Sequence, residues 1–412
     1  MKNKLFSKDF TLVVIGQIIS LFGNATIRFA LPLYLLNLTG SAALYGTVTA
    51  CAYIPAVVLS PVGGIVADRV NKRNIMVVLD FFTAALILTF SILMNGVNVV
   101  VLLTITLMLL YGIAGAYQPS VQASIPALVS QENYMAANSV INVISSLSAL
   151  IGPALGGVLY SAYGLSPVLW VCIGCFFLSA VMEIFIYMPF QKQPSDGGIW
   201  RMVKKDFAES ISFIIKEKPA VGKGLLVVCG INLFLSSMIN VGLPYLITEV
   251  LDLGDLQTSR LYGFAAGTLA AGGLAGGVCA GFLSGRLVIQ KSGKLLTGAA
   301  LCVFPVGISM LISRSGLVNY FVIVVCCFII MIFSTVFTVQ VMSFVQAQTP
   351  VNLIGKVISV ILTISMCSQP LGSMLYGFLF EALKGWEFAV VLFAGIVSLG
   401  IAVGAEKVFE GL

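Results

Sequence analysis

The chain has 412 residues, of which 59% are hydrophobic and only 9% are charged, and its mean hydropathy is +1.06. These values exclude an ordinary water-soluble domain and indicate a protein that lies within a lipid bilayer. The net charge of +6 does not indicate a nucleic-acid-binding surface, because the basic residues are distributed according to membrane side.

Apolar stretches along the chain are long enough to cross a hydrocarbon core of about 30 Å as helices rising about 1.5 Å per residue. They are predicted at residues 10–36, 42–67, 74–94, 98–122, 134–161, 166–189, 222–248, 261–283, 295–313, 318–346, 354–383 and 386–405. The first is too long and too polar for a signal peptide, so we expect it to be retained. The sequence therefore predicts an all-α polytopic membrane protein with twelve transmembrane helices.

Basic residues favour one side of this topology. Of the 22 Lys and Arg residues, all but Arg260, Arg314, Lys384 and the intramembrane Arg28 fall on the side that holds both termini. Cytoplasmic connections carry an excess of Lys and Arg, so we expect both termini to be cytoplasmic. No nucleic-acid partner is expected.

An internal repeat divides the chain. Leu44-Tyr45-Gly46 recurs 217 residues later as Leu261-Tyr262-Gly263, Pro153 corresponds to Pro370 at the same offset, and further short matches keep the same order. Such order indicates two parallel bundles of six helices. We expect an N-terminal bundle at residues 1–188, a cytoplasmic linker at 189–221 and a C-terminal bundle at 222–412.

The linker contains an amphipathic segment. Apolar residues recur at helical spacing in IWRMVKKDFAESISFIIKEK, residues 199–218. We expect this helix to lie on the inner leaflet or beneath the bundle, and a partner-binding role is the alternative.

A charged loop follows the second span, with Gly64, Asp68, Arg69, Lys72 and Arg73. Together with the twelve spans, the parallel halves and the long central loop, it resembles the major facilitator superfamily across essentially the whole chain. Asn71 stands where that pattern has glycine. Because asparagine tolerates a positive φ best among the other residues, we expect the turn to survive.

The resemblance implies that this loop latches the cytoplasmic ends of the two halves when the cavity opens outward. Asp68 can face the positive N-terminus of a helix, and Arg69 and Arg73 can bridge to carboxylates or carbonyls there. The alternative, basic residues that only anchor the topology, leaves Asp68 unexplained. The predicted cytoplasmic gate comprises Gly64, Asp68, Arg69, Arg73 and, within reach of the arginines, Asp80.

The fifth span contains Gly152-Pro153-Ala154-Leu155-Gly156-Gly157, which resembles the Gly-Pro-x-x-Gly-Gly element of exporters in this superfamily. Proline removes a backbone hydrogen bond and glycines allow close packing, so Gly152, Pro153, Gly156 and Gly157 are predicted to form a hinge. The whole pattern is most similar to the bacterial macrolide-efflux and siderophore-export branch. That similarity implies a location in the bacterial cell (inner) membrane.

Polar residues inside hydrocarbon are costly and suggest a transport path. Gln17, Ser20, Asn24 and Arg28 follow one stripe of a helix. The predicted substrate cavity comprises Gln17, Asn24 and Arg28 from the first span, Tyr111, Gln118 and Gln122 from the fourth, and Asn232, Ser236 and Asn240 from the seventh.

Arg28 has three competing interpretations, because a central arginine costs about 2.5 to 3.5 kcal/mol on insertion scales. It binds an anionic or carbonyl-rich substrate group, or it pairs permanently with an acid or a helix C-terminus, or it extends to the outer water layer.

Energy coupling has little support from the residues. The sequence has no histidine, Walker A loop, dinucleotide fingerprint or metal-ligand cluster, so we expect a secondary transporter without a cofactor rather than an enzyme. The acids within spans are Asp80, Glu183 and Glu381. Glu183 is interpreted as a structural acid at the membrane interface, and proton antiport is implied by the resemblance alone.

The sequence thus predicts a secondary active exporter of amphipathic organic molecules, drug- or macrolide-like, that works by alternating access. Its expected partners are a small amphipathic substrate, protons and the lipid bilayer, and it is expected to act as a monomer. The alternatives are a transporter of lysophospholipids or other amphiphiles between leaflets and a membrane sensor with a transporter fold.

Overall fold

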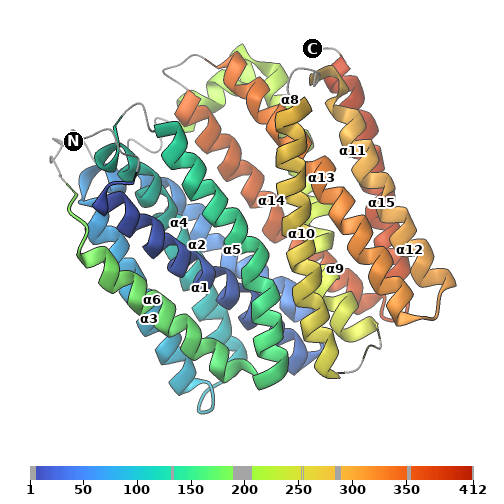
Figure 1. Ribbon diagram of the computed structural model, residues 1–412. Coiled ribbons are helices and arrows are strands. Elements are labelled where there is room, and N and C mark those ends of the chain that lie inside the picture. The colour runs from blue at the N-terminus through green and yellow to red at the C-terminus, as the bar shows by residue number, and fades with distance from the viewer. Residues whose placement is uncertain are drawn as a thin grey trace. The chain divides into compact units, whose positions relative to one another are not determined.

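The computed structural model describes residues 6–130, 134–188, 207–251, 253, 255–283, 289–349 and 354–410, although within some helices, such as at residues 60–69, it describes only the backbone. All secondary-structure elements of the described residues are helices (Figure 1). The helices of the first half are α1 (Lys8–Thr39), α2 (Ala42–Arg69), α3 (Lys72–Leu93), α4 (Val99–Leu128), α5 (Tyr134–Tyr163) and α6 (Leu165–Ile184). Each corresponds to one predicted span.

The second half follows the same plan. Its helices are α8 (Pro219–Ile231), α9 (Ser237–Tyr245), α10 (Asp255–Leu283), α11 (Ser292–Leu301), α12 (Val303–Ile312), α13 (Gly316–Gln348), α14 (Ile354–Ala382) and α15 (Glu387–Glu410). Among the described residues, 11 helical stretches are long and apolar enough to cross a membrane. The 29-residue α14 occupies the remaining predicted span. The all-α polytopic fold is therefore confirmed.

Helix α3 shows how composition directs packing in the first half. Its buried residues recur every three or four positions and are Met76, Asp80, Thr83, Ala84, Ile87 and Phe90. Such spacing forms a single face, which packs against α6 and α4. Figure 1 shows α3 and α6 side by side. Val78 and Phe82 lie outside this face, where large apolar side chains are exposed as a bilayer allows.

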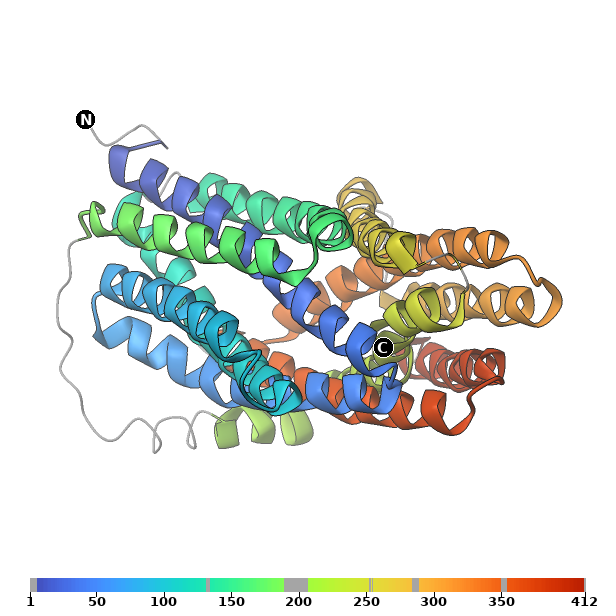
Figure 2. The same ribbon diagram turned by 90° about the horizontal axis from the view of Figure 1, so that it is seen from below.

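Helix α1 lies beside α6 (Figure 2, dark blue and green). The Ser179 hydroxyl donates to the Gly16 carbonyl at 3.1 Å, and the Cys172 thiol points to the Gly23 carbonyl. A Cβ at Gly23 would lie 3.1 Å from the Cys175 Cβ, tighter than an ordinary contact. Small residues therefore bring the two backbones together, as is common between membrane helices.

Asn71 makes its turn in a different way from the one predicted. Its φ is −59°, and no described residue other than glycine has a positive φ. Instead, its side-chain oxygen accepts a hydrogen bond from the Arg73 N–H at 3.1 Å and caps the start of α3. The loop therefore does not need glycine, because asparagine is a favoured N-cap residue.

In the second half, α10 packs along α13, and α11 and α12 pack along α15. Glycines permit the first of these contacts. A Cβ at Gly272 would lie 2.6 Å from the Phe328 carbonyl oxygen, and one at Gly276 would lie 2.8 Å from that of Ile332. The predicted seventh span is one helical stretch over Pro219–Val250, interrupted by wider π-type turns at Asn232–Ser236 and Leu246–Val250.

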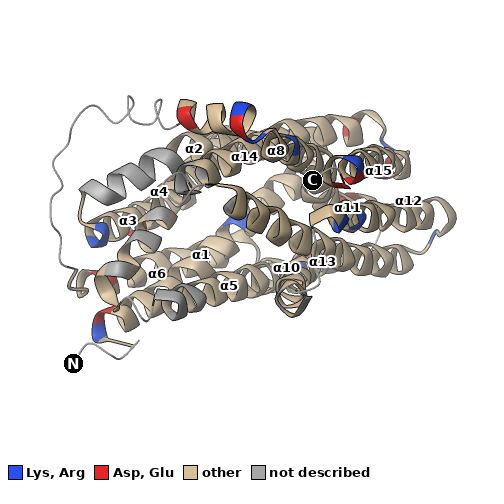
Figure 3. Ribbon diagram, turned by 90° about the horizontal axis from the view of Figure 1, so that it is seen from above, with Lys and Arg blue, Asp and Glu red and all other residues tan. Residues whose placement is uncertain are grey.

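The chain forms two compact units, and their boundary crosses α1 and α2. The first comprises Met1–Leu35 and Cys51–Arg201, and the second comprises Leu36–Ala50 and Met202–Leu412. The predicted bundle and linker boundaries stay predictions. Of the predicted amphipathic segment, residues 199–206 lie outside the described residues, whereas residues 207–217 are helical, with Ile214 buried and Ile215 exposed. Figure 3 shows Lys, Arg, Asp and Glu mainly near helix ends, and uncharged segments between them.

Candidate functional site: a buried acid cluster and an arginine on α1

Polar side chains from four helices meet inside the first unit, and we call them the buried acid cluster. They are Gln17 and Ser20 on α1, Asp80 on α3, Tyr117 on α4 and Glu183 on α6. The Ser20 hydroxyl donates to Asp80 Oδ1 at 3.0 Å. The Gln17 amide donates to the Tyr117 hydroxyl at 2.6 Å, and this hydroxyl donates to Glu183 Oε1 at 2.9 Å. Each member is at most 5% exposed, so the cluster is shielded from water and lipid.

The cluster groups residues for which the sequence predicts different sites. Gln17 was predicted in the substrate cavity, Asp80 in the cytoplasmic gate and Glu183 at the membrane interface. The structure gives Asp80 a partner on α1 and buries Glu183 completely. The sequence does contain signals of this cluster: a polar pair at i and i+3 on the first span, and one acid on each of two further spans. These signals do not predict that the three spans lie next to one another.

Arg28 lies on the same stripe of α1, farther along the helix. Its guanidinium carbon is 3.5 Å from the centroid of the Tyr111 ring, and Tyr111 meets Tyr53 edge-on with centroids 5.1 Å apart. A cation over a tyrosine ring gains about 0.5 to 2 kcal/mol, depending on how far it is desolvated. Arg28 remains partly exposed, and within the described part of the chain its guanidinium has no hydrogen-bond partner. Its donors are therefore available to a ligand.

The other cavity candidates fall in both units. In the first unit Asn24 and Gln118 are partly exposed, whereas the side chain of Gln122 lies outside the described residues. The candidates of the second unit lie on the seventh span. A cavity that includes residues of both units stays a prediction.

Two of the seventh-span candidates, Asn232 and Ser236, lie in the widened turn, whereas Asn240 lies on α9. The Asn232 amide donates to the Ser365 carbonyl at 3.2 Å, and the Ser236 hydroxyl donates to Asn232 Oδ1 at 3.4 Å. The Asn240 carbonyl accepts from the Tyr45 hydroxyl at 3.5 Å. Single π-type turns inside helices frequently accompany functional sites, because they redirect side chains and free main-chain groups.

The predicted gate is only partly visible. The structure describes only the backbone of Gly64, Asp68 and Arg69. The Arg73 guanidinium donates to the Glu183 carbonyl at 3.4 Å and to the Ile184 carbonyl, and so caps the end of α6 within its own unit. A cation is stabilised there by the negative end of the helix dipole. The gate between halves stays a prediction.

The predicted hinge lies inside an uninterrupted helix, with Pro153 among the residues of α5. A Cβ at Gly152 would lie 2.5 Å from the Ala25 Cβ, and one at Gly156 would lie 3.3 Å from the Thr26 Cγ2. The Thr26 hydroxyl also donates to the Gly152 carbonyl at 3.4 Å. Gly157 is buried as well. These glycines therefore place α5 directly against α1.

A contact in the second unit was not predicted. Glu381 Oε2, at the end of α14, accepts from the Ser41 hydroxyl at 2.9 Å and from the Ala43 N–H at 3.3 Å, at the start of α2. One turn farther, a Cβ at Gly46 would lie 2.3 Å from the Ser373 carbonyl oxygen. Because residues 36–50 belong to the second unit, this contact joins the start of α2 to α14 within one compact body.

Comparisons with known proteins agree with this architecture. A family model described as Major Facilitator Superfamily matches residues 13–373. Macrolide efflux protein A of Streptococcus pyogenes is 24% identical over 375 residues, which cover 89% of this chain and 88% of that protein. The multidrug efflux pump Tap of Mycolicibacterium fortuitum is 21% identical over 383 residues, which cover 90% and 89% of the two chains.

Solved structures show the same fold. A mutant of the nucleoside transporter NupG matches with a TM-score of 0.77 at 13% identity, over 97% of this chain and 99% of that one. A bacterial homologue of the lysosomal transporter Spinster matches with a TM-score of 0.73 at 15% identity, over 98% and 99%. The chain belongs to the major facilitator superfamily, and it is a multi-pass secondary transporter rather than an enzyme.

Proposed function

We propose that this chain is a proton-coupled exporter of amphipathic organic molecules, drug- or macrolide-like, that works by alternating access. The observation that carries the proposal is the Arg28 guanidinium, which is partly exposed, stacks on Tyr111 and leaves its donors free of described partners. An aromatic face with an adjacent cation suits a substrate that has both an apolar body and an anionic or carbonyl-rich group.

Two similarities support the direction and the class of substrate. Relatives at 21 to 24% identity over most of the chain are described as macrolide or multidrug efflux proteins. The Gly152 element also resembles that of exporters, and the structure packs it against α1, the helix that carries Arg28. Sites that bind apolar ligands orient them with a small number of polar groups, and Arg28 and Tyr111 would supply such groups here.

Drug accumulation in cells that express the chain tests the proposal. We expect a lowered accumulation of erythromycin or of other amphipathic drugs, and we expect a proton uncoupler to abolish the difference. Arg28→Gln should raise the substrate concentration for half-maximal export about tenfold, which corresponds to about 1.4 kcal/mol. Arg260→Gln is the matched control, because Arg260 is exposed and also lies over an aromatic ring, 5.6 Å from the Phe264 centroid. Unchanged accumulation across a broad panel would contradict the proposal.

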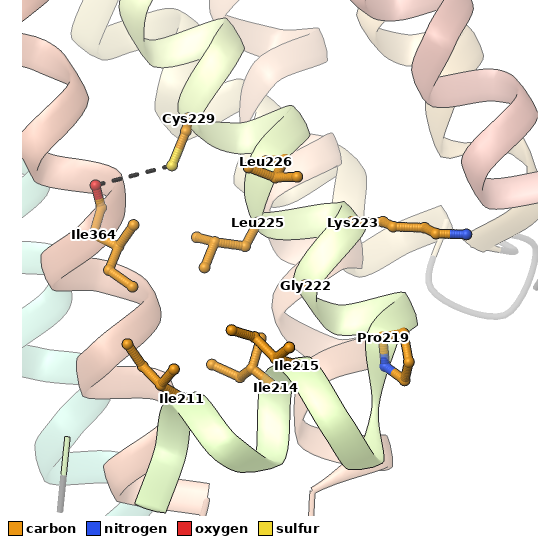
Figure 4. Close-up of a pocket in the computed structure, with 10 residues that line it drawn as sticks. All are labelled: Ile211, Ile214, Ile215, Pro219, Gly222, Lys223, Leu225, Leu226, Cys229 and Ile364. Atoms are coloured by element: carbon orange, nitrogen blue, oxygen red, sulfur yellow. Dashed lines mark hydrogen bonds between the residues drawn. The ribbon is translucent and has the colours of Figure 1, made fainter. Parts of the chain in front are cut away.

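A second candidate, movement of a lysophospholipid or similar amphiphile between leaflets, is favoured by an apolar pocket of about 430 Å³ in the second unit. Figure 4 shows Ile211, Leu225 and Ile364 directed towards one another and Lys223 extended away from them. The remaining lining residues are Ile214, Ile215, Pro219, Gly222, Leu226 and Cys229. Transfer of a fluorescent lysophospholipid across proteoliposomes, without any drug transport, would favour this candidate.

A further inference from the structure

The two carboxyl groups of the buried acid cluster have no compensating positive charge. Asp80 and Glu183 are 2% and 0% exposed, and they are close enough for their charges to interact. Among the side chains that the structure describes, no lysine or arginine nitrogen bonds to either carboxyl group. An isolated buried carboxylate is costly by several kcal/mol, and two neighbouring ones also repel each other. At least one of the two carboxyl groups must therefore carry a proton in this buried arrangement.

The hydrogen bonds of the cluster lead to the same conclusion. Gln17 Oε1, Asp80 Oδ2 and Glu183 Oε2 are all buried acceptor atoms without a donor in the described structure. An ionised carboxylate can only accept, whereas a neutral carboxylic acid offers one O–H donor. The cluster is short of donors, and a proton on either acid supplies one.

No other group facing the cluster replaces that proton. The α1 side chains in the cluster, Gln17 and Ser20, are uncharged, and the Tyr117 hydroxyl of α4 is neutral. From α6, Ser179 lies beside Asp80, and its hydroxyl also donates to the α1 backbone. Arg73, on α3, bonds to main-chain oxygens at the end of α6 and not to a carboxyl group.

We propose that the buried acid cluster is the site at which this transporter takes up and releases its coupling proton, through Asp80 and Glu183. Uptake adds one proton to a carboxylate oxygen to give a neutral acid, and release returns that proton to water. This proposal rests on the proton coupling proposed above. The proton governs how α3 and α6 are linked to α1: Asp80 is bonded directly by Ser20, and Glu183 is connected to Gln17 through the Tyr117 hydroxyl of α4. Helix α1 carries Asn24 and Arg28 farther along the same stripe.

The internal repeat shows that this site is particular to the first half. At the offset of 217 residues, Asp80 corresponds to Thr297 on α11. The Thr297 hydroxyl donates to Glu406 Oε1 on α15 at 2.8 Å, and Glu406 is partly exposed. One partly exposed, hydrogen-bonded acid thus stands where the first half has two buried acids. Glu406→Gln is therefore a matched control.

Infrared spectroscopy of the purified protein in lipid tests the site without any substrate. The wild type should show the C=O band of a buried protonated carboxyl group, which declines as pH rises. Asp80→Asn and Glu183→Gln should each remove the band or shift its titration, and Tyr117→Phe should shift it, whereas Glu406→Gln should leave it unchanged. A wild-type spectrum without such a band, or the same titration in all variants, would overturn the proposal. Because both acid variants are nearly isosteric neutral forms, we expect them to fold.

Transport by proteoliposomes then tests coupling, with labelled erythromycin as the probe. Glu183→Gln should retain exchange of erythromycin at equal concentrations but lose at least tenfold in accumulation driven by a proton gradient, and Glu406→Gln should retain both. Full proton-driven accumulation by Glu183→Gln would refute the site. Accumulation driven by sodium at constant pH and lost in Glu183→Gln would replace the proton by a metal cation. If erythromycin is not transported but the infrared titration behaves as expected, the proposed substrate fails and the site stands.

Discussion

Arg28 illustrates how a single cation is accommodated inside a membrane helix. Its guanidinium lies over the ring of Tyr111, and Tyr111 is in turn held edge-on by Tyr53. Pairing with an acid was one of the three interpretations, but within the described residues Arg28 faces aromatic rings. The ring faces offset part of the desolvation cost and leave the hydrogen-bond donors unused.

A double-mutant cycle measures this contact. Tyr111→Leu should lower the free energy of unfolding by about 0.5 to 2 kcal/mol more in the wild type than in an Arg28→Met background, because only the wild type loses a cation over a ring. Tyr111→Phe should show little coupling, since phenylalanine keeps the ring face. Thermal unfolding in detergent provides the measurement. Equal effects of Tyr111→Leu in both backgrounds would show that the ring contributes only packing.

At the scale of helices, glycine determines which elements touch. Gly152 on α5 faces Ala25 on α1 so closely that one additional methyl group would lie 2.5 Å from the Ala25 Cβ. In contrast, Gly174 on α6 is exposed, and a Cβ added there would meet no neighbouring atom within 4 Å. The Gly-Pro element is therefore a packing site for the helix that carries both Arg28 and two members of the buried acid cluster.

Gly152→Ala should destabilise the protein by about 1 to 3 kcal/mol, because the added methyl group overpacks the contact. Ala25→Gly in the same chain should restore most of the loss by removing the opposing methyl group. Gly174→Ala should be neutral or slightly stabilising, as expected for a helical glycine with open space. Melting temperatures of the four proteins check this set, and a Gly152→Ala protein as stable as the wild type would show that α5 does not rely on this contact.

At the scale of the molecule, transport requires contacts that break and re-form in each cycle. The contact of Glu381 with the start of α2 is suited to this, because a carboxylate at a helix N-terminus is stabilised by the exposed N–H groups and by the helix dipole, but only by about 0.3 to 1 kcal/mol. Gly46 allows the backbones to meet there without intervening side chains.

Glu381→Gln should therefore weaken this contact and shift the equilibrium between its formed and broken states about two- to fivefold towards the broken state. Spin labels at Leu38 and Leu383, both exposed near this contact, should report a larger fraction of long distances. Glu410→Gln is the control, because Glu410 is exposed at the end of α15. Identical distance distributions in Glu381→Gln and the wild type would show that the Glu381 carboxylate does not hold this contact together.

Much of the fold was predictable from the sequence, whereas the site was not. The predicted span 42–67 became α2 at Ala42–Arg69, and 386–405 became α15 at Glu387–Glu410. At Asn71 the turn is present as predicted, but for a different physical reason. The side chain caps the start of α3, and the expected positive φ is absent. The acid cluster was divided among three predicted roles because its members come from separate helices.

The sequence by itself determined the number and approximate limits of the membrane helices and the family, because transfer of a helix into lipid depends on the composition of a short continuous segment. Only the tertiary structure decided that Tyr117 meets Glu183, 66 residues away, and that Arg73 caps a helix end 111 residues away. Helical periodicity indicates which residues share a face. Which helix that face meets depends on packing between distant segments. This packing places the two buried acids, Asp80 and Glu183, in one cluster.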